Sequence, residues 1–169
     1  MKLVFIDGQY TDFLRRADYR VPFNKNDSYK RPFVGIVFEI DERKYFAPLT
    51  SHNKHERLVE KPKAEDVTFF PINDCKHGGI NFNNMIPVVE GVYNPVDLFH
   101  NKADTPNERK YKYLLNIQTQ FIMRNRGKIA RKAKTLYYLK IHGDLKQGAD
   151  KRVCDFKALE IQMAKYKED

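Results

Sequence analysis

The segment PLTSHNKH, residues 48–55, concentrates polar side chains where a predicted β-hairpin ends. It holds two hydroxyls, two imidazoles, one amide and one ammonium group. Hydroxyl and amide groups can bind the nonbridging oxygens of a phosphate diester, and a lysine can offset the negative charge. An ordinary polar turn is the alternative, because threonine and serine often cap a turn. The segment by itself is compatible with both interpretations.

A hairpin would bring this segment next to a second polar stretch. FVGIVFEI (33–40) and KYFAPLTS (44–51) are apolar runs rich in β-formers, and DER separates them. NDSYKRP (26–32) directly precedes the first run, and the two ends of an antiparallel hairpin lie side by side. We therefore expect one polar rim, with Tyr10 of a preceding helix nearby. Its members are Tyr29, Lys30, Arg31, Thr50, Ser51, His52, Asn53 and Lys54.

These side chains suit a phosphodiester of RNA. The 2′-hydroxyl of RNA is a built-in nucleophile, so cleavage without a metal needs a base near it, an acid near the 5′-oxygen and cations around the phosphorus. Lysine, histidine, tyrosine or a hydroxyl that relays a proton can serve, and tyrosine rings offer a stacking surface for bases. The rim is therefore a candidate active site for RNA cleavage, in which His52 and Asn53 are expected to bind the RNA.

The chain has 169 residues and a formal net charge of +9, which is unevenly distributed. Residues 101–169 contain 17 basic and 8 acidic side chains, whereas the first hundred residues contain 14 of each. Such asymmetry favours a nucleic acid or another anionic partner, although solvated helix faces give the same pattern. In the run RNRGKIARKAK we expect an RNA-binding surface at the junction of two helices. Its candidate residues are Arg124, Arg126, Lys128, Arg131, Lys132 and Lys134.

Several classes of protein are not indicated. The sequence contains no phosphate-binding loop, dinucleotide-binding, zinc-protease or nucleophile-elbow motif. Cys75 and Cys154 are far apart, so we expect structural thiols rather than a zinc cluster. We expect neither a metal nor a cofactor. No apolar run approaches the roughly 20 residues needed to span a bilayer, and the N-terminal one is too short for a secretion signal. We expect a cytoplasmic protein.

The first ninety residues have the pattern of a sheet with one helix. Besides the hairpin, strands are expected at 2–6 and within 67–72 and 80–89. Gly35 predicts a bulge or a close backbone approach, and Pro48 predicts an edge position or a bend. Residues 7–18 predict an amphipathic helix of about three turns. Its expected buried face is Tyr10, Phe13, Leu14 and Ala17.

The pattern becomes helical after residue 104. Thr105, Pro106 and Glu108 predict a capping box at the start of a helix that ends near residue 126. A second helix is expected over 127–141, and a third is expected to begin at Asp155 as N-cap. Strands first and helices later predict an α+β fold in one domain, residues 1–169. We expect a compact, strongly bent antiparallel sheet or barrel with peripheral helices and a helix-rich C-terminal part.

Five segments of the sequence carry a more specific signal. YTDFLRRAD with the following VPF, RPFVGIVFEI, KYFAPLTS, INFNNMIPV and CDFKALE follow one another over nearly the whole chain. In kind and order they resemble the toxins of type III toxin–antitoxin systems, the ToxN/AbiQ family. APLTS and NNMIPV together are much more specific than a generic ribonuclease pattern.

The resemblance implies a fold, an activity and a partner. The fold would be a compact, bent antiparallel sheet with helices, like the MazF and CcdB toxins. The activity would be metal-independent, sequence-preferring endoribonuclease cleavage, leaving 2′,3′-cyclic phosphate and 5′-hydroxyl ends. The inhibitor would be an RNA antitoxin that the toxin cuts into pseudoknot units, usually bound in a closed ring of alternating protein and RNA. Many members act in abortive defence against phage.

The resemblance also implies roles for rim residues. The family's Thr-Ser pair falls on Thr50 and Ser51, and its following lysine on Lys54. Its two tyrosines fall on Tyr29 and Tyr10, and its lysine before the hairpin falls on either Lys30 or Arg31. We expect the hydroxyls to orient the phosphate, with Ser51 able to relay a proton. A lysine would stabilise the charge on phosphorus, and the tyrosines would position the substrate. No general base is assigned.

Two rival functions remain open from the sequence. A non-catalytic RNA-binding module would use the same charge asymmetry and tyrosines, but would leave the polar rim unexplained. A toxin of this fold could instead act on a protein such as a gyrase, which the late basic half disfavours. Toxicity in cells separates the toxins from the binding module, and RNA product chemistry separates the nuclease from the gyrase poison.

Overall fold

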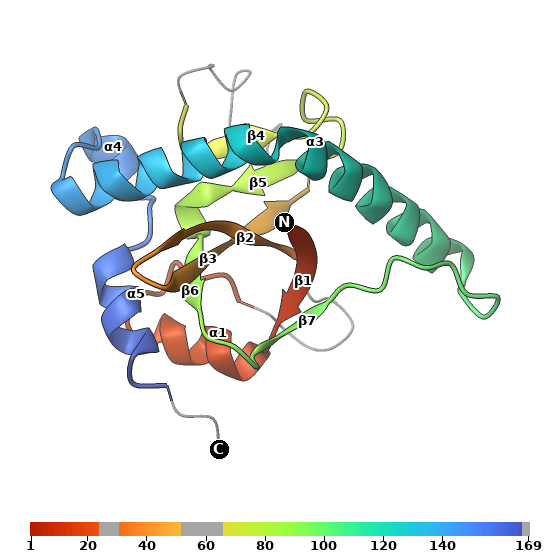
Figure 1. Cartoon of the computed structure of the whole chain (residues 1–169), viewed down its shortest axis with the longest axis horizontal. Coiled ribbons are helices and arrows are strands. Elements are labelled where there is room, and N and C mark those ends of the chain that lie inside the picture. Colours follow the sequence, from red (N-terminus) through yellow and green to blue (C-terminus); the bar gives the residue numbers. More distant parts are fainter. Residues whose placement is uncertain (24–30, 52–65, 167–169) are drawn as a thin grey trace.

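A computed structural model describes residues 1–23, 31–51 and 66–166 of the chain (Figure 1). Seven strands form one antiparallel sheet in the order β4-β5-β3-β2-β1-β7, and β6 also pairs with β3. The strands are β1 (Lys2–Ile6), β2 (Phe33–Ile40), β3 (Arg43–Thr50), β4 (Phe69–Pro71), β5 (Gly79–Asn81), β6 (Ile86–Val88) and β7 (Tyr93–Pro95). The predicted α+β class is confirmed. Within the described residues, the outer strands β4 and β7 do not pair with each other, so the sheet is open rather than a closed barrel.

The β2–β3 hairpin forms where the sequence predicts it. Asp41 and Glu42 make its two-residue turn with positive φ values of 46° and 62°, the conformation that suits the twist of a tight hairpin. The predicted irregularity is present at Gly35, and its close neighbour is a side-chain ring rather than another backbone. The register shifts between Val34 and Phe38, and a Cβ on Gly35 would lie 1.9 Å from the Phe46 ring.

Strand β3 is central, so the prediction of an edge position for Pro48 is wrong. β2 flanks β3 on one side, and on the other side β6 pairs with Lys44–Phe46 while β5 pairs with Leu49 and Thr50. The Leu49 N–H points to β2, where it donates to Pro32 O at 2.9 Å, so the nitrogen of Pro48 faces the opposite side. Pro48 therefore lies where β3 changes partners, and no ladder bond needs its missing N–H.

One long helix replaces the two that the sequence predicts. α3 (Pro106–His142) runs for 37 residues, and its predicted capping box at Thr105 and Glu108 is present. The buried side chains continue at helical spacing through the expected break: Leu115, Gln118, Ile122, Ile129, Ala133, Leu136 and Tyr137. Because this stripe packs against the core on both sides of Gly127, the glycine does not end the helix.

The remaining helical elements are short. α1 (Gly8–Arg15) has two turns rather than three, with the Asp7 side chain accepting from Gln9 N, and Ala17 lies exposed beyond it. α4 spans Gln147–Asp150, and α5 (Phe156–Met163) begins at the predicted N-cap Asp155. A 3-10 turn, η2 (Phe82–Asn84), interrupts the run expected to form one strand over 80–89, and β7 is a strand that the sequence pattern does not predict.

Helices α3 and α5 cover the sheet and are tied to it by a shared carboxylate. Glu160 Oε1 of α5 accepts hydrogen bonds from Tyr45 of β3 and Tyr137 of α3, each at 2.8 Å. The N-terminal end of α3 extends beyond the sheet, beside the segment after β7 (Figure 1). Lys112 holds that segment, donating to Phe99 O at 2.7 Å and to Asp104 at 3.1 Å.

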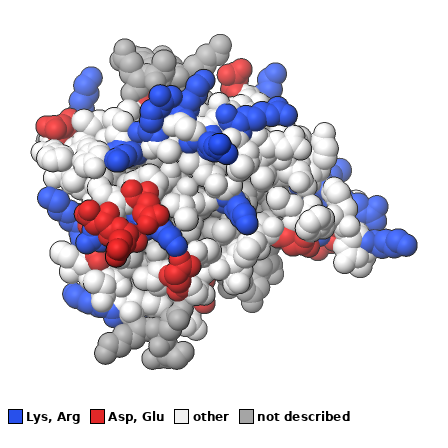
Figure 2. Space-filling model, viewed as in Figure 1, with Lys and Arg blue, Asp and Glu red and all other residues white. Residues whose placement is uncertain are grey.

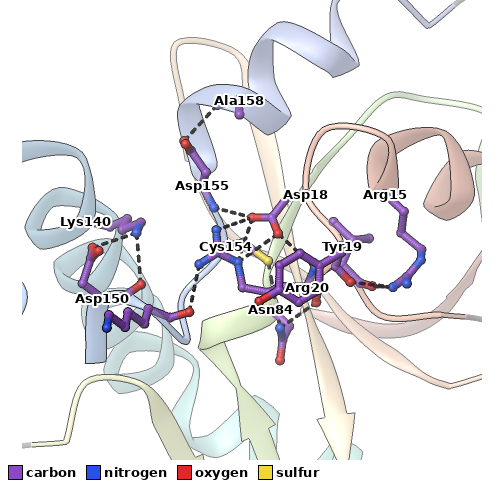
Figure 3. Close-up of polar contacts among 12 residues, drawn as sticks. Arg15, Asp18, Tyr19, Arg20, Asn84, Lys140, Asp150, Cys154, Asp155 and Ala158 are labelled. Carbon is purple, nitrogen blue, oxygen red and sulfur yellow. Dashed lines mark hydrogen bonds and ion pairs between the residues drawn. The ribbon is translucent and has the colours of Figure 1, made fainter. Parts of the chain in front are cut away.

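A polar cluster links the loop after α1 to the start of α5 (Figure 3). The buried Asp18 carboxylate accepts from the Arg20 guanidinium and from Asp155 N at 2.7 Å. Burial raises the pKa of Asp18, but these donors outweigh it and hold that pKa below the ordinary value. Arg20 also donates to Lys151 O at 3.0 Å, and Asn84 donates to Arg20 O at 2.7 Å. The cluster is fully used in holding the fold together.

No described helix combines the length and the apolar character that a membrane span requires. The two cysteines of the described residues are free thiols, and Cys154 is buried.

Candidate active site

Thr50 and Ser51 lie at the end of β3, beside the start of β2. Thr50 pairs with Gly79 of β5, and Ser51 is exposed directly after the strand. The hydrogen bond from Leu49 N to Pro32 O brings the chain that leaves β3 next to the chain that enters β2. The expected neighbourhood of these two ends is therefore present. Of the predicted rim, Tyr29, Lys30, His52, Asn53 and Lys54 lie outside the described residues.

Of the basic residues predicted for the rim, Arg31 lies within the part of the chain that the structure describes. The β2–β3 register pairs Phe33 with Pro48, and extending it by two residues sets Arg31 opposite Thr50. Arg31 is half-buried, and burial lowers the pKa of its guanidinium. An arginine keeps its charge in proteins despite such a shift. It can therefore supply a fixed positive charge on the chain opposite Thr50.

Tyr10 does not lie on the rim, and its predicted contact with substrate is contradicted by its burial. Its side chain is 0% exposed, and its hydroxyl donates to Pro87 O at 2.8 Å. Its ring packs edge-on against Tyr166, with the ring centroids 4.9 Å apart. Burial also raises the pKa of the hydroxyl well above its usual value, so it stays protonated at neutral pH. Neither stacking on a base nor proton abstraction is open to a side chain in this position.

A strained turn between β4 and β5 packs against Thr50 and Ser51. Gly78 has a φ of +74°, and a Cβ on it would lie 2.1 Å from Thr50 O and 3.5 Å from Ser51 Cα. Asn73, Asp74 and Cys75 of the same turn also have positive φ values, between 48° and 70°. A non-glycine residue rarely adopts this conformation, and such strain gathers at functional sites. Only a glycine at position 78 lets the turn approach the catalytic candidates so closely.

The same turn is also anchored to α3 by a hydrogen bond. The buried Gln118 donates from Nε2 to His77 O at 2.8 Å, and Asn73 Nδ2 lies 2.9 Å from His77 Nδ1. In the sequence, HGG at 77–79 indicates only an ordinary tight turn and is not connected to the rim. The sequence feature that could have indicated this contact is Gln118. It is a polar residue among apolar neighbours on a buried helix face, and a buried polar side chain needs a hydrogen-bond partner.

The basic candidates lie along α3, and Arg124 and Arg131 lie on the side opposite the buried Ile122 and Ile129. Arg124, Arg126, Lys128, Arg131 and Lys134 are exposed, and Lys132 is half-buried with Nζ 5.9 Å from the Phe70 ring centroid. Burial lowers the pKa of Lys132. Figure 2 shows Lys and Arg side chains gathered over the part of the surface that α3 forms. The basic residues therefore lie along one helix and not around a junction of two, and their binding of RNA stays a prediction.

The charge of this helix is one-sided. Residues 109–143 contain ten Lys and Arg residues and no Asp or Glu. Within the described part of the chain, ion pairs engage Lys112 and Lys140 of this stretch, and the five exposed cations named above form none. Like charges three or four residues apart on a helix repel one another, which favours an anionic partner for this face.

Comparison with known proteins decides the family. Residues 2–164 match the family model of the toxin ToxN of type III toxin–antitoxin systems. This chain belongs to the ToxN family. The endoribonuclease ToxN of Pectobacterium atrosepticum is 36% identical over 167 residues, which cover 95% of this chain and 90% of that protein. The endoribonuclease ToxN of Bacillus thuringiensis subsp. kurstaki is 34% identical over 167 residues, which cover 96% of this chain and 82% of that protein.

Solved structures give the same family. A protein from a bacterial antiviral system regulated by a processed non-coding RNA superposes with a TM-score of 0.80, at 32% identity over 99% of this chain and all of that one. A type III toxin selectively inhibited by a non-coding RNA pseudoknot has a TM-score of 0.76 at 31% identity, and the match covers 99% of this chain and 98% of that one. The lactococcal anti-phage endoribonuclease AbiQ has a TM-score of 0.77 at 23% identity, covering 96% of this chain, and shares the fold.

Thr50, Ser51 and Arg31 are of residue types that bind a phosphodiester, and this role of the end of β3 stays a prediction. The Thr50 and Ser51 hydroxyls can donate to nonbridging oxygens, and the Arg31 guanidinium can offset their charge. Groups of three or more His, Cys, Asp or Glu able to ligate a metal do not occur among the described residues of this ToxN-family chain. Experiment must decide the prediction of metal-independent cleavage.

Proposed function

We propose that this chain is an endoribonuclease toxin of a type III toxin–antitoxin system. The observation that carries the proposal is the placement of Thr50 and Ser51 at an exposed strand end, packed against a strained turn, in a chain of the ToxN family. A non-catalytic RNA-binding module would not need two hydroxyls held in this way. We regard residues 1–169 as one endoribonuclease domain that acts in the cytoplasm.

Cleavage proceeds through the RNA's own 2′-hydroxyl. Its oxygen attacks the adjacent phosphorus and loses its proton, while the bond from phosphorus to the 5′-oxygen breaks and that oxygen gains a proton. The products are a 2′,3′-cyclic phosphate and a 5′-hydroxyl, and no metal is required. Ser51 and Thr50 orient the phosphate, and Arg31, Lys30 or Lys54 stabilises the charge that develops on it. Tyr29 positions the substrate, and the general base remains unassigned.

The α3 surface binds folded RNA, including the inhibitor. Ten cations without a carboxylate over 109–143 match the phosphate backbone, and the inhibitor of one relative is a non-coding RNA pseudoknot. We propose that this chain cuts its antitoxin transcript into pseudoknot units, which then hold it in a closed protein–RNA assembly. Release of the toxin during phage infection would stop growth of the infected cell.

The decisive experiment is cleavage of end-labelled RNA of mixed sequence in excess EDTA. The native chain is expected to cut and to leave 2′,3′-cyclic phosphate ends, and Ser51→Ala is expected to lose about a hundredfold or more of the rate while still binding RNA. Asn94→Ala, an exposed change in β7, is the matched control and should cut normally. Tight RNA binding without cleavage by the native chain would favour the binding module instead.

A further inference from the structure

Gly127 occupies a position in α3 where the protein itself has no use for a glycine. It is exposed in the middle of the 37-residue helix, 21 residues after Pro106. Among the described residues, and apart from the backbone of its own helix, a Cβ placed on it would meet no atom within 4 Å. Glycine inside a helix is less favourable than alanine by up to about 1 kcal/mol. Neither the backbone conformation nor packing within the described chain offsets that cost.

The neighbours of Gly127 on the helix surface are cations. Arg124 precedes it by three residues and Arg131 follows it by four, which places all three on one side of the helix. The rise of an α-helix separates the two arginine Cα atoms by about 10.5 Å along the axis. Ile122 and Ile129 lie on the opposite, buried side. Gly127 is therefore a notch in a row of positive side chains that faces away from the core.

Both features of this stretch reduce the stability of the free helix. Arg124 and Lys128 are four residues apart, as are Lys128 and Lys132, and like charges at this spacing repel. The glycine adds its own cost. A polyanion with a ridge that fits between the arginines would offset both, because it neutralises the charges and uses the space that a side chain would fill.

We propose that the ribose–phosphate backbone of bound RNA crosses α3 in close contact at Gly127, with Arg124 and Arg131 binding phosphates on either side. The inference rests on the proposed function of this chain as an RNA-binding toxin. Helix carbonyl oxygens keep a second lone pair after their helical hydrogen bond, so a ribose 2′-hydroxyl that comes close enough can donate to one. A side chain at position 127 would hold the ribose away from them.

The test uses the Ser51→Ala chain, so that the probe is bound but not cut. The probe is a fluorescent RNA that folds into a stem-loop, because the α3 surface is proposed to bind folded RNA. Gly127→Ala should raise the melting temperature and weaken RNA binding severalfold. Gly127→Leu should weaken it about tenfold or more, the change that 1.4 kcal/mol represents. The salt dependence of binding should be unchanged, because neither variant removes a charge.

Gly148 provides the matched control. It lies exposed in α4, and outside that helix no atom of the described part of the chain is within 4 Å of a Cβ placed there, so Gly148→Ala and Gly148→Leu should leave the dissociation constant unchanged. Arg124→Glu with Arg131→Glu tests the surface itself. If that double variant binds weakly while Gly127→Leu binds like the parent, the close approach at Gly127 is wrong and the RNA surface stands. If the parent and the double variant bind RNA equally, or the parent binds none, the proposed RNA surface fails as well.

Discussion

At the scale of single residues, burial separates positions that belong to the core from those that meet a substrate. Tyr10 shows the difference, because its spacing with Leu14 predicted a buried helix face while the family resemblance implied a substrate contact. The structure agrees with the spacing. A side chain that completes the core cannot also present its ring to a base, so any effect of Tyr10 on activity passes through the fold.

Tyr10→Phe tests that distinction. The change removes the hydrogen bond to Pro87 O and leaves a buried carbonyl without its partner. The free energy of unfolding should fall by about 1–2 kcal/mol, measured by urea titration. The cleavage rate well below the melting temperature should stay within twofold of the native rate, about 0.4 kcal/mol. Tyr113→Phe, at a side chain that is 65% exposed, is the control and should change neither quantity. Abolished cleavage at unchanged stability would return Tyr10 to the active site.

At the scale of elements, local rules predicted the hairpin and the caps, and long-range packing decided the rest. The two apolar runs around Asp41 and Glu42, and the capping box at Thr105, each follow from a few adjacent residues. The continuity of α3 does not, because a glycine near the middle of a basic run signals a break unless the buried stripe on both sides meets one core. The turn after β4 does not follow from adjacent residues either, because its residues with positive φ are mostly not glycines.

That turn gives the buried Gln118 a function in positioning. Gln118→Met keeps the shape of the side chain but removes the donor to His77 O, so the turn is no longer anchored on α3. Because Gly78 of this turn packs against Thr50 and Ser51, kcat should fall about tenfold while KM changes little. A change confined to KM, or to stability with kcat intact, would show that the anchor does not position the site. Gln120→Met on the exposed side of the same helix is the control.

At the scale of the whole molecule, the chain divides its charge between two tasks. The first hundred residues are neutral overall and build all seven strands of the described sheet and the strand end with its hydroxyls, whereas the excess of +9 lies in the last two fifths. The positions of the charged residues in the sequence are enough to predict this uneven distribution of charge. They do not predict that Lys132 packs on Phe70, which makes this residue a poor choice for a test of charge alone.

Arg131→Glu with Lys134→Glu provides the cleaner test of the RNA surface. Both side chains are exposed, and within the described residues neither forms an ion pair. The Lys134 Nζ lies 5.8 Å from the centroid of the exposed Tyr138 ring, a surface contact whose loss should leave the fold intact. RNA affinity should fall, and the slope of log affinity against log salt should flatten by about one unit for each phosphate that the variant no longer binds. Lys157→Glu with Lys165→Glu changes the net charge by the same amount at exposed positions in and after α5. If both pairs weaken binding equally, the attraction comes from net charge rather than from α3. If only the α3 pair flattens the slope, the phosphates lie on this helix.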